Sequence, residues 1–213
     1  MNKLLIIGSG SQARYVIDTI NENGNYKIAG IVDIEQVSNA GKIVNGVKIV
    51  CFWANISDHF SNTDAQVIVA FGNNGKKREI VGALKAKGFK FAQSISNHAH
   101  ISPFTKIGEG CIINPATTIM PNAKLGCHVI VHSHSVIEHD NIIEDYVNIG
   151  PGVSFGGSVH VKEGAYIYTG AIIIPKIIIG KEAIVGAGAV VIRNVANGDT
   201  VVGNPAKSVV NNK

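Results

Sequence analysis

The sequence predicts two domains: a small Rossmann-like α/β domain over residues 1–95, followed by a parallel β-helix over residues 96–213. In the first part, strand-like apolar segments alternate with helical patterns, which is typical of a parallel α/β sheet. In the second part, a large apolar residue recurs at every sixth position without a gap. The composition agrees, because only 6% of the 213 residues are aromatic while Ile, Val and Gly are abundant, a bias toward strands and tight turns.

Each element of the N-terminal domain has its own signal. An apolar run at the start of the chain ends at a glycine-rich loop, and the residues after this loop fit a helix. A second apolar run ends on Asp33, and a third leads into the sequence Phe71-Gly72-Asn73-Asn74. The expected elements are, in order, a strand at Lys3–Ile7, a helix through about Glu22, a strand at Lys27–Val32, a strand at Gln66–Ala70 and a helix at Lys76–Lys87.

The loop Gly8-Ser9-Gly10-Ser11-Gln12-Ala13 fits the G-x-G-x-x-A pattern of dinucleotide-binding loops. In such loops the glycines let the backbone approach a phosphate, and the helix N-terminus provides free N–H groups. Asp33 stands where an acid commonly binds a ribose. The domain is too short for a two-lobed dinucleotide site, so we expect a mononucleotide or a nucleotide sugar, with Asn73 and Asn74 in the neighbouring loop. The alternative is that the glycines only form a tight turn.

The C-terminal domain repeats with a period of six residues. A unit of six residues with one large and one small inward side chain corresponds to a short strand and a turn. Three such units close a triangular coil, and successive coils stack at the strand spacing of about 4.8 Å. The large apolar positions are Ile101, Ile107, Ile113, Ile119, Leu125, Val131, Ile137, Ile143, Ile149, Phe155, Val161, Ile167, Ile173, Ile179, Val185 and Val191.

Histidines cluster in this repeat, which has no packing need for them: five of the eight lie between residues 128 and 160. His139 follows the inward Ile137 by two residues, so its side chain should leave the coil near a corner, between Glu138 and Asp140. A neutral imidazole can accept a proton from an attacking amine or hydroxyl at pH 7. A carboxylate on its other nitrogen holds the required tautomer. His139 is therefore the candidate general base.

Over essentially its whole length the chain resembles the two-domain bacterial sugar acyltransferases, which comprise the UDP-4-amino-sugar N-acetyltransferases and the related sialic-acid O-acetyltransferase group. The resemblance implies that the β-helix is left-handed and that the protein is a homotrimer with active sites between subunits. It also implies direct transfer from acetyl-CoA to a nucleotide-linked sugar, expected to be a UDP-4-amino sugar, without a metal. The segments that carry it are Gly8–Ala13, Asp33, Phe71–Asn74, Ser135–Asp140 and Gly203-Asn204-Pro205-Ala206-Lys207.

The same resemblance implies roles for individual residues. His139 would be the base and Asp140 would raise its basicity. In the mechanism that we expect, a backbone N–H such as that of Gly157 stabilises the oxyanion. Acetyl-CoA would lie along the β-helix and touch Asn148, Gly157, Thr169 and Ala187. Nucleotide-sugar contacts would come from Gly10, Ser11, Gln12, Asp33, Asn73 and Asn74. Three residues depart from the family pattern: Gln12 and Asn148 stand where histidines are common, and His132 stands where asparagine is frequent.

Other functions remain open at this stage. His98, His134 and His139 resemble the zinc-ligand spacing of gamma-class carbonic anhydrases, which would make the protein a zinc hydratase. The glycine loop could belong to a nicotinamide-dependent oxidoreductase, and the trimer could be a non-catalytic scaffold. Within the acyltransferase family, the base alone does not separate N-acetylation from O-acetylation, because both reactions need a proton acceptor.

Charge and cysteine content limit the partners and the compartment. The net charge of +4 is modest and the lysines are scattered, so we expect no nucleic-acid partner. Cys51, Cys111 and Cys127 are odd in number, and the apolar run at the N-terminus is too short for a signal peptide, which together indicate a reducing, cytoplasmic setting. The apolar stretch at residues 165–179 is interrupted by Lys176 and fits the soluble repeat better than a membrane span.

Overall fold

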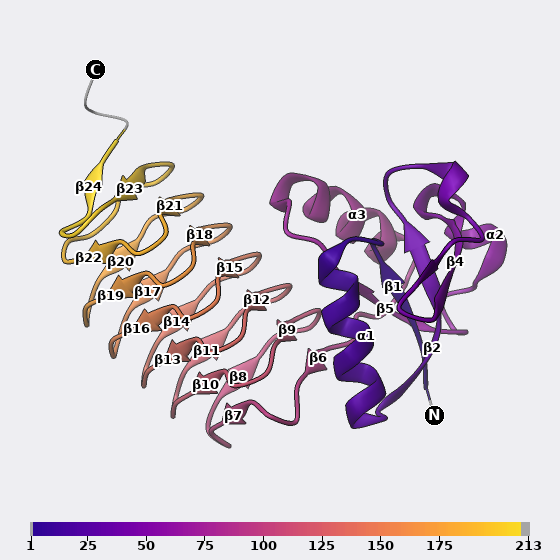
Figure 1. Cartoon of the computed structure of the whole chain (residues 1–213), viewed down its shortest axis with the longest axis horizontal. Helices are drawn as coiled ribbons and strands as arrows, with labels where there is room; N and C mark the ends of the chain where they lie inside the picture. The colour runs from indigo at the N-terminus through magenta and orange to yellow at the C-terminus, as the bar shows by residue number, and fades with distance from the viewer. Residues whose placement is uncertain (1, 210–213) are drawn as a thin grey trace. The chain divides into compact units, whose positions relative to one another are not determined.

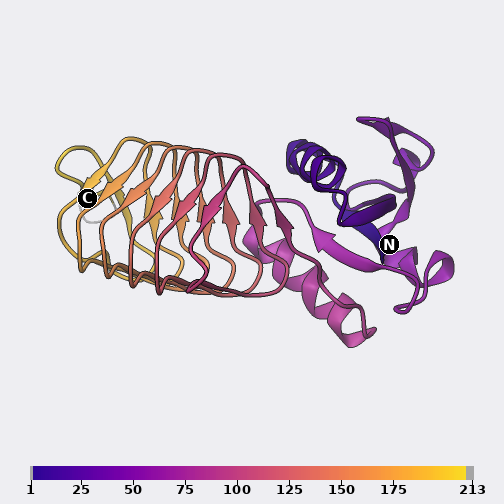
Figure 2. The same ribbon diagram turned by 90° about the horizontal axis from the view of Figure 1, so that it is seen from below.

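The computed structural model describes residues 2–209 (Figures 1 and 2). The chain divides between Asn97 and His98 into two compact units, two residues after the division expected from the sequence. The first unit is a parallel α/β sheet with helices and the second is a stack of triangular coils. The predicted fold class, a Rossmann-like domain followed by a left-handed parallel β-helix, is confirmed.

The N-terminal unit contains a five-stranded sheet of order β3-β4-β2-β1-β5. Strands β1, β2, β4 and β5 are parallel, and β3 pairs with β4 in the antiparallel direction. The elements are β1 (Asn2–Ile7), α1 (Ser11–Asn23), β2 (Tyr26–Asp33), η1 (Val37–Asn39), β3 (Ile43–Val44), β4 (Val47–Phe52), η2 (Trp53–Asn55), α2 (Ile56–His59), β5 (Gln66–Val69), α3 (Asn74–Ala86) and β6 (Ser94–Ile95).

The order of this sheet creates a switch point at β1. From β1 the chain passes through α1 to β2 on one side, while β5 pairs with the other side of β1. In open parallel sheets, ligands bind at the carboxyl ends of the strands where the connections diverge in this way. The loops that follow β1 and β5 therefore lie where a nucleotide site is expected.

Helix α3 begins two residues before the expected start at Lys76. The Asn73 side chain accepts a hydrogen bond from the Lys76 backbone N–H at 2.9 Å, so Asn73 is the N-cap of α3. The cap lets Asn74 and Gly75 complete the first turn, although neither is a strong helix former.

Two-residue strands separated by turns build the C-terminal unit (Figures 1 and 2). Residues eighteen apart pair in register, as Thr118 does with Val136, so one coil contains eighteen residues. The strands are β7 (His100–Ile101), β8 (Lys106–Ile107), β9 (Ile112–Ile113), β10 (Thr118–Ile119), β11 (Lys124–Leu125), β12 (Ile130–Val131), β13 (Val136–Ile137), β14 (Ile142–Ile143), β15 (Asn148–Ile149), β16 (Ser154–Phe155), β17 (His160–Val161), β18 (Tyr166–Ile167), β19 (Ile172–Ile173), β20 (Ile178–Ile179), β21 (Ile184–Val185), β22 (Val190–Val191), β23 (Thr200–Val202) and β24 (Lys207–Ser208).

Three flat sheets form the walls of this prism. One contains β7, β10, β13, β16, β19 and β22, a second contains β8, β11, β14, β17 and β20, and a third runs from β9 through β12, β15, β18 and β21 to β23 and β24. The second residue of each two-residue strand points inward, and from Ile113 to Val191 these residues are at most 4% exposed. Stacked aliphatic side chains fill the prism, and truncating one of them to alanine typically costs about 2–5 kcal/mol.

The corners of the prism depend on left-handed backbone conformations. At most corners this conformation is taken by a residue other than glycine, for example Asn122, His134 and Asp140, with φ between 60° and 63°. Such conformations cost most residues roughly 1–2 kcal/mol, but Asn and Asp tolerate them better. Asp140 therefore has a backbone role at its corner in addition to any chemical role.

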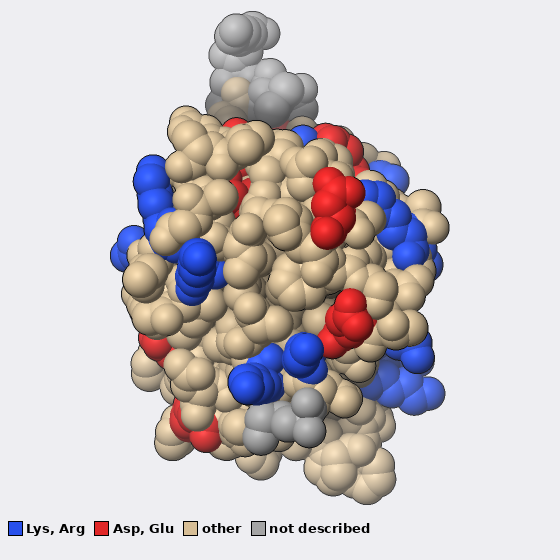
Figure 3. All heavy atoms as spheres, turned by 90° about the vertical axis from the view of Figure 1, so that its right-hand side faces the viewer, with Lys and Arg blue, Asp and Glu red and all other residues tan. Residues whose placement is uncertain are grey.

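Within residues 2–209, none of the helices combines the length and the apolar character needed to cross a membrane. The apolar stretch at residues 165–179 forms the strands β18 and β19 of the prism and the turns beside them. On the face drawn in Figure 3, Lys and Arg side chains lie in separate small groups interspersed with Asp and Glu rather than in one continuous basic patch.

Candidate active site

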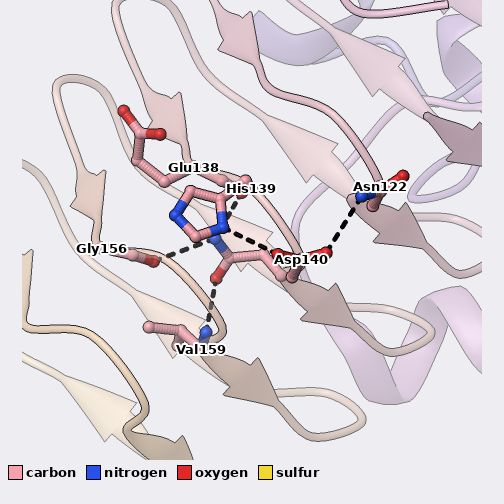
Figure 4. Close-up of polar contacts among 7 residues, drawn as sticks. Asn122, Glu138, His139, Asp140, Gly156 and Val159 are labelled. Carbon is pink, nitrogen blue, oxygen red and sulfur yellow. Dashed lines mark hydrogen bonds and ion pairs between the residues drawn. The ribbon is translucent and has the colours of Figure 1, made fainter. Parts of the chain in front are cut away.

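His139 lies at the corner that follows strand β13, with its side chain projecting from the prism (Figure 4). The side chain is 58% exposed. Its Nδ1 lies 2.8 Å from Oδ2 of Asp140, the next residue in the chain. With Nδ1 donating to the carboxylate, Nε2 carries the lone pair and is free to accept a proton from a substrate.

Asp140 is held by a second side chain from the coil below. Asn122 donates from Nδ2 to Oδ1 of Asp140 at 3.2 Å, so each carboxylate oxygen has one donor. The hydrogen bonds from His139 and Asn122 hold the pKa of Asp140 below its ordinary value, and the carboxylate is ionised at neutral pH. Figure 4 shows the Glu138 carboxylate pointing away from the imidazole, so Asp140 is the acid that pairs with His139.

Gly157 lies against the imidazole from the coil above. A Cβ atom at position 157 would be 2.5 Å from Nε2 and 2.6 Å from Cε1 of His139, so only glycine leaves room for the ring in this position. The Ser158 N–H donates to the His139 carbonyl oxygen at 2.9 Å, which keeps the two turns in contact. Within residues 2–209 the N–H of Gly157 itself has no acceptor, so it can donate to a ligand.

The eighteen-residue period explains this grouping. Gly157 is one coil after His139, and Asn122 is one coil before Asp140. His139, Asp140 and Gly157 were expected from the sequence, whereas Asn122 was not. Asn122 could have been found from the sequence, because it precedes Asp140 by eighteen residues, and residues eighteen apart stack at the same corner.

The other residues expected to contact acetyl-CoA lie elsewhere on the prism. Thr169 and Ala187 are exposed and stack at another corner, where the Gly188 N–H donates to the Thr169 carbonyl oxygen at 2.9 Å. Within one chain, the sheet that contains β13, β16 and β19 separates this corner from that of His139. Asn148 belongs to β15 in a different sheet and is only 8% exposed. One chain thus brings Gly157 to His139 but does not bring Asn148, Thr169 and Ala187 there.

Exposed apolar side chains cover part of the sheet between these two corners. Ile172 on β19 is 48% exposed, and Ile174 and Ile192 beside it are 38% and 42% exposed. Tyr168, next to Thr169, is 50% exposed. Isolated exposed apolar residues are ordinary, but a group on one sheet marks a surface suited to a partner or an apolar ligand.

In the N-terminal unit, the loop after β1 touches the loop after β5. Gly8 has φ of 110°, and a Cβ there would lie 3.0 Å from the Ala70 carbonyl oxygen, so a larger residue would push the two loops apart. Gly10 is the N-cap of α1, makes no side-chain cap, and has open space where a Cβ would be. The N-terminal amides of α1, starting at Ser11, are therefore available for an anionic group.

Two amide side chains at these helix ends are buried. Gln12 is 8% exposed, and its Nε2 has no hydrogen-bond partner within residues 2–209. Asn74, in the first turn of α3, is 3% exposed, whereas Asn73 is exposed and already caps that helix. Gln12 and Asn73 are thus at the two helix starts that follow β1 and β5.

Asp33 has a structural environment that differs from the expected open ribose site. Its side chain is fully buried and accepts from the Ser9 hydroxyl at 2.5 Å and from the Asn39 amide at 3.2 Å. It also accepts from two backbone N–H groups, those of Glu35 and Gln36, at 2.8 and 2.9 Å. Burial alone would raise the pKa of Asp33, but the four donors together hold it below its ordinary value. The carboxylate organises the loops after β1 and β2, and a ligand would have to replace one of these donors.

The histidines of the zinc alternative do not form a ligand group in this chain. His134 is exposed and follows Ser133 at the corner shared with Thr169, whereas His139 lies at the next corner. Across residues 2–209, no three His, Cys, Asp or Glu side chains are grouped in a way that could hold a metal ion.

The chain is similar to known proteins in two comparisons, one with a family model and one with solved structures. Residues 3–84 match the family model described as the PglD N-terminal domain. No curated protein sequence matches the chain significantly. Among solved structures, the acetyltransferase domain of PglB from Neisseria gonorrhoeae in complex with acetyl coenzyme A is 30% identical, with a TM-score of 0.91 over 98% of this chain and 100% of that one.

Two further solved structures match over nearly the whole length of both chains. A histidine-to-alanine mutant of GDP-perosamine N-acetyl transferase from Caulobacter crescentus, in complex with CoA and GDP-perosamine, is 28% identical, with a TM-score of 0.88 over 98% of this chain and 97% of that one. WeeI from Acinetobacter baumannii is 29% identical, with a TM-score of 0.89 over 98% and 100% of the two chains.

Proposed function

The chain belongs to the hexapeptide-repeat sugar acetyltransferases, and we propose that it transfers the acetyl group of acetyl-CoA directly to the amino group of a nucleotide-linked 4-amino sugar. The observation that carries this proposal is the geometry at His139: Nδ1 is paired with an ionised carboxylate, Nε2 is free, and the ring lies against a glycine with an unused N–H. UDP is the expected nucleotide. GDP is the alternative, since one relative was solved with GDP-perosamine.

We propose the following reaction at this site. The lone pair of the sugar amine attacks the thioester carbonyl carbon, and Nε2 of His139 takes a proton from the nitrogen as the C–N bond forms. Asp140 stabilises the imidazolium, as the carboxylate does in a catalytic triad. The C–S bond then breaks, and the thiolate of CoA receives the proton from His139. The products are the N-acetylated sugar and free CoA, and the base returns to its starting state.

The N–H of Gly157 is our candidate oxyanion donor. It has no acceptor within the chain as described, and it belongs to the residue against which the imidazole rests. Removing one such donor typically lowers kcat about 10²–10³-fold in acyl-transfer enzymes. A substrate carbonyl oxygen bound there would keep its carbon within reach of an amine that is hydrogen-bonded to Nε2.

We propose that the active enzyme is a homotrimer whose sites form between subunits. Thr169 and Ala187 occupy a different corner of the prism from His139, so acetyl-CoA could span both sets only if a second copy brought its own corner alongside. The exposed apolar side chains around Ile172 support an interface or a ligand surface on the intervening sheet.

We assign the nucleotide-sugar contacts to the loops after β1 and β5. The uncapped N-terminus of α1 at Gly10 and Ser11 is suited to the diphosphate. Gln12 has an amide donor without an acceptor, while Asn73 and Asn74 lie at the start of α3. The buried Asp33 carboxylate stabilises the loop after β1 through its hydrogen bond with Ser9. The three cysteines are free thiols, which fits the cytoplasm as the place of the reaction.

The direct test is release of CoA thiol from acetyl-CoA with UDP- and GDP-linked 4-amino sugars, and with sialic acid as an O-acceptor. We expect turnover with a nucleotide-linked amino sugar and a loss of about 10²–10⁴-fold on His139→Ala. His59→Asn is the control: it removes an exposed histidine at the end of α2 that is not among the residues assigned to the site. Activity with sialic acid alone, or a fully active His139→Ala variant, would contradict the proposal.

A further inference from the structure

Asn141, the residue after Asp140, makes hydrogen bonds with the turn that carries His139 and with the turn of the next coil. Figure 4 shows its partners Glu138, Gly156 and Val159 around His139. The Asn141 side chain is fully buried. Nδ2 donates to the Glu138 carbonyl oxygen at 2.6 Å and to the Gly156 carbonyl oxygen at 3.0 Å, and Oδ1 accepts from the Val159 N–H at 3.1 Å. Both amide hydrogens and the amide oxygen are thus used.

Part of this pattern is common to the repeat. At the equivalent inner position of other turns, a short polar side chain donates to the carbonyl oxygen fifteen residues later, as Ser135 does to Gly150 at 2.9 Å. Thr117 makes the same bond to His132. Asn141 makes this bond to Gly156 and adds two more, one within its own turn and one to a backbone N–H of the next coil.

The three hydrogen bonds of the Asn141 side chain connect the turn that carries His139 with the turn that contains Gly157. The Glu138 carbonyl immediately precedes His139 in the chain, while the Gly156 carbonyl and the Val159 N–H lie on either side of the turn that contains Gly157. A single planar amide therefore fixes the turn that holds the imidazole relative to the turn against which the imidazole rests. The contact between Gly157 and His139 is close enough that a small shift between the two coils would move the ring.

We propose that Asn141 is a positioning residue for the acetyl transfer: it holds the turn of His139 against the turn of Gly157 so that Nε2 and the Gly157 N–H face the same reacting group. This inference rests on the proposed function, because it takes His139 as the base. Asn141 touches neither substrate and acts through the two turns that it joins.

The proposal predicts a change in kcat without a change in substrate binding. Asn141→Leu keeps a similar volume but removes all three hydrogen bonds, and we expect kcat to fall about 10–100-fold, the scale of a misplacement near 1 Å, with the KM values for acetyl-CoA and sugar within about twofold of wild type. Asn141→Ser keeps a hydroxyl that can donate to Gly156 as Ser135 donates to Gly150, but it is too short for the other two contacts. Asn141→Ser should therefore regain thermal stability relative to Asn141→Leu without regaining kcat.

Two measurements separate this role from a general loss of stability. Ser135→Ala removes the equivalent cross-coil bond at another corner, and we expect it to lower the melting temperature while leaving kcat near the wild-type value. In a His139→Ala background, Asn141→Leu should reduce the residual activity by clearly less than it reduces wild-type activity, because the part of its effect that passes through the imidazole is already lost.

Failure of the positioning role and failure of the proposed function would give different results. Wild-type kcat in Asn141→Leu or in Asn141→Ser, or a full additional loss in the His139→Ala background, would overturn the positioning role and leave the acetyltransferase assignment intact. Inactivity of the wild-type enzyme toward every nucleotide-linked amino sugar tested would instead refute the proposed function itself.

Discussion

Replacing Gly157 by alanine tests whether the imidazole of His139 works in the position that the structure gives it. The added Cβ would lie 2.5 Å from Nε2, 2.6 Å from Cε1 and 3.2 Å from Cδ2 of the ring. Ordinary carbon contacts need about 3.5 Å, so the ring must move by about 1 Å. The ring can move because its side chain is 58% exposed, and the cost should fall on catalysis more than on folding.

A displacement of about 1 Å at a catalytic group costs on the order of 10²-fold in rate, which corresponds to about 2.7 kcal/mol in the activation free energy. We therefore expect kcat for thiol release to fall about 10²-fold in Gly157→Ala. The backbone N–H at position 157 is retained in alanine, so the loss would report on the imidazole. Steady-state measurement with acetyl-CoA and the amino sugar checks this value.

Two variants control for nonspecific effects of the added methyl group. Gly82→Ala adds a Cβ in helix α3 with no atom within 4 Å, and it should leave kcat unchanged. In the double variant Gly157→Ala with His139→Ala, the clash is absent, so activity should match that of His139→Ala alone. A Gly157→Ala enzyme with wild-type kcat would show that the ring does not rest on Gly157 during turnover, and the geometric argument for the site would fail.

Two further predictions concern the carboxylates. Asn122→Ala removes one of the donors that lower the pKa of Asp140, so the pKa of Asp140 should rise and kcat should fall a few-fold; an unchanged pH–kcat profile would contradict this coupling. Asp33 has a pKa below its unfolded value, so its contribution to the free energy of unfolding is complete above about pH 4 and is lost as the pH falls through the lower, folded value. Asp33→Asn should destabilise the protein at pH 7 by about 1–3 kcal/mol and flatten the pH dependence below pH 4, as measured by urea unfolding.

The prism could be predicted because its core imposes a strict period on the sequence. Ile137 and Phe155 recur in register since each must point inward, and no helix or simple strand pattern has a spacing of six. The same regularity located His139 at a corner. The corner conformations themselves were not predictable, because Asp140 and His134 take a left-handed φ without being glycine.

The parts of the site that escaped prediction depend on contacts between coils or on burial. Asn122 acts on His139 through the Asp140 carboxylate, to which it donates from the coil below. Asn141 bonds to the turn of the coil above, and neither residue belongs to a known short motif. Asp33 matched the position of a ribose-binding acid, but no local pattern predicted that Ser9 and Asn39 would donate hydrogen bonds to its carboxylate. The local sequence pattern predicts where a side chain lies along its strand. The residues that the side chain contacts depend on how the strands and turns are arranged in the fold.

The eighteen-residue period also governs which insertions and deletions the protein can accept. A residue added to the turn at Gly157 would shift every later residue relative to the coil beneath and would withdraw the support of the imidazole. A duplication of one whole coil after Phe155 and the turn that follows it would leave His139, Asn141 and Gly157 stacked as they are. Length variation in this domain should therefore occur in steps of eighteen residues, or as loops that project outward from a single corner.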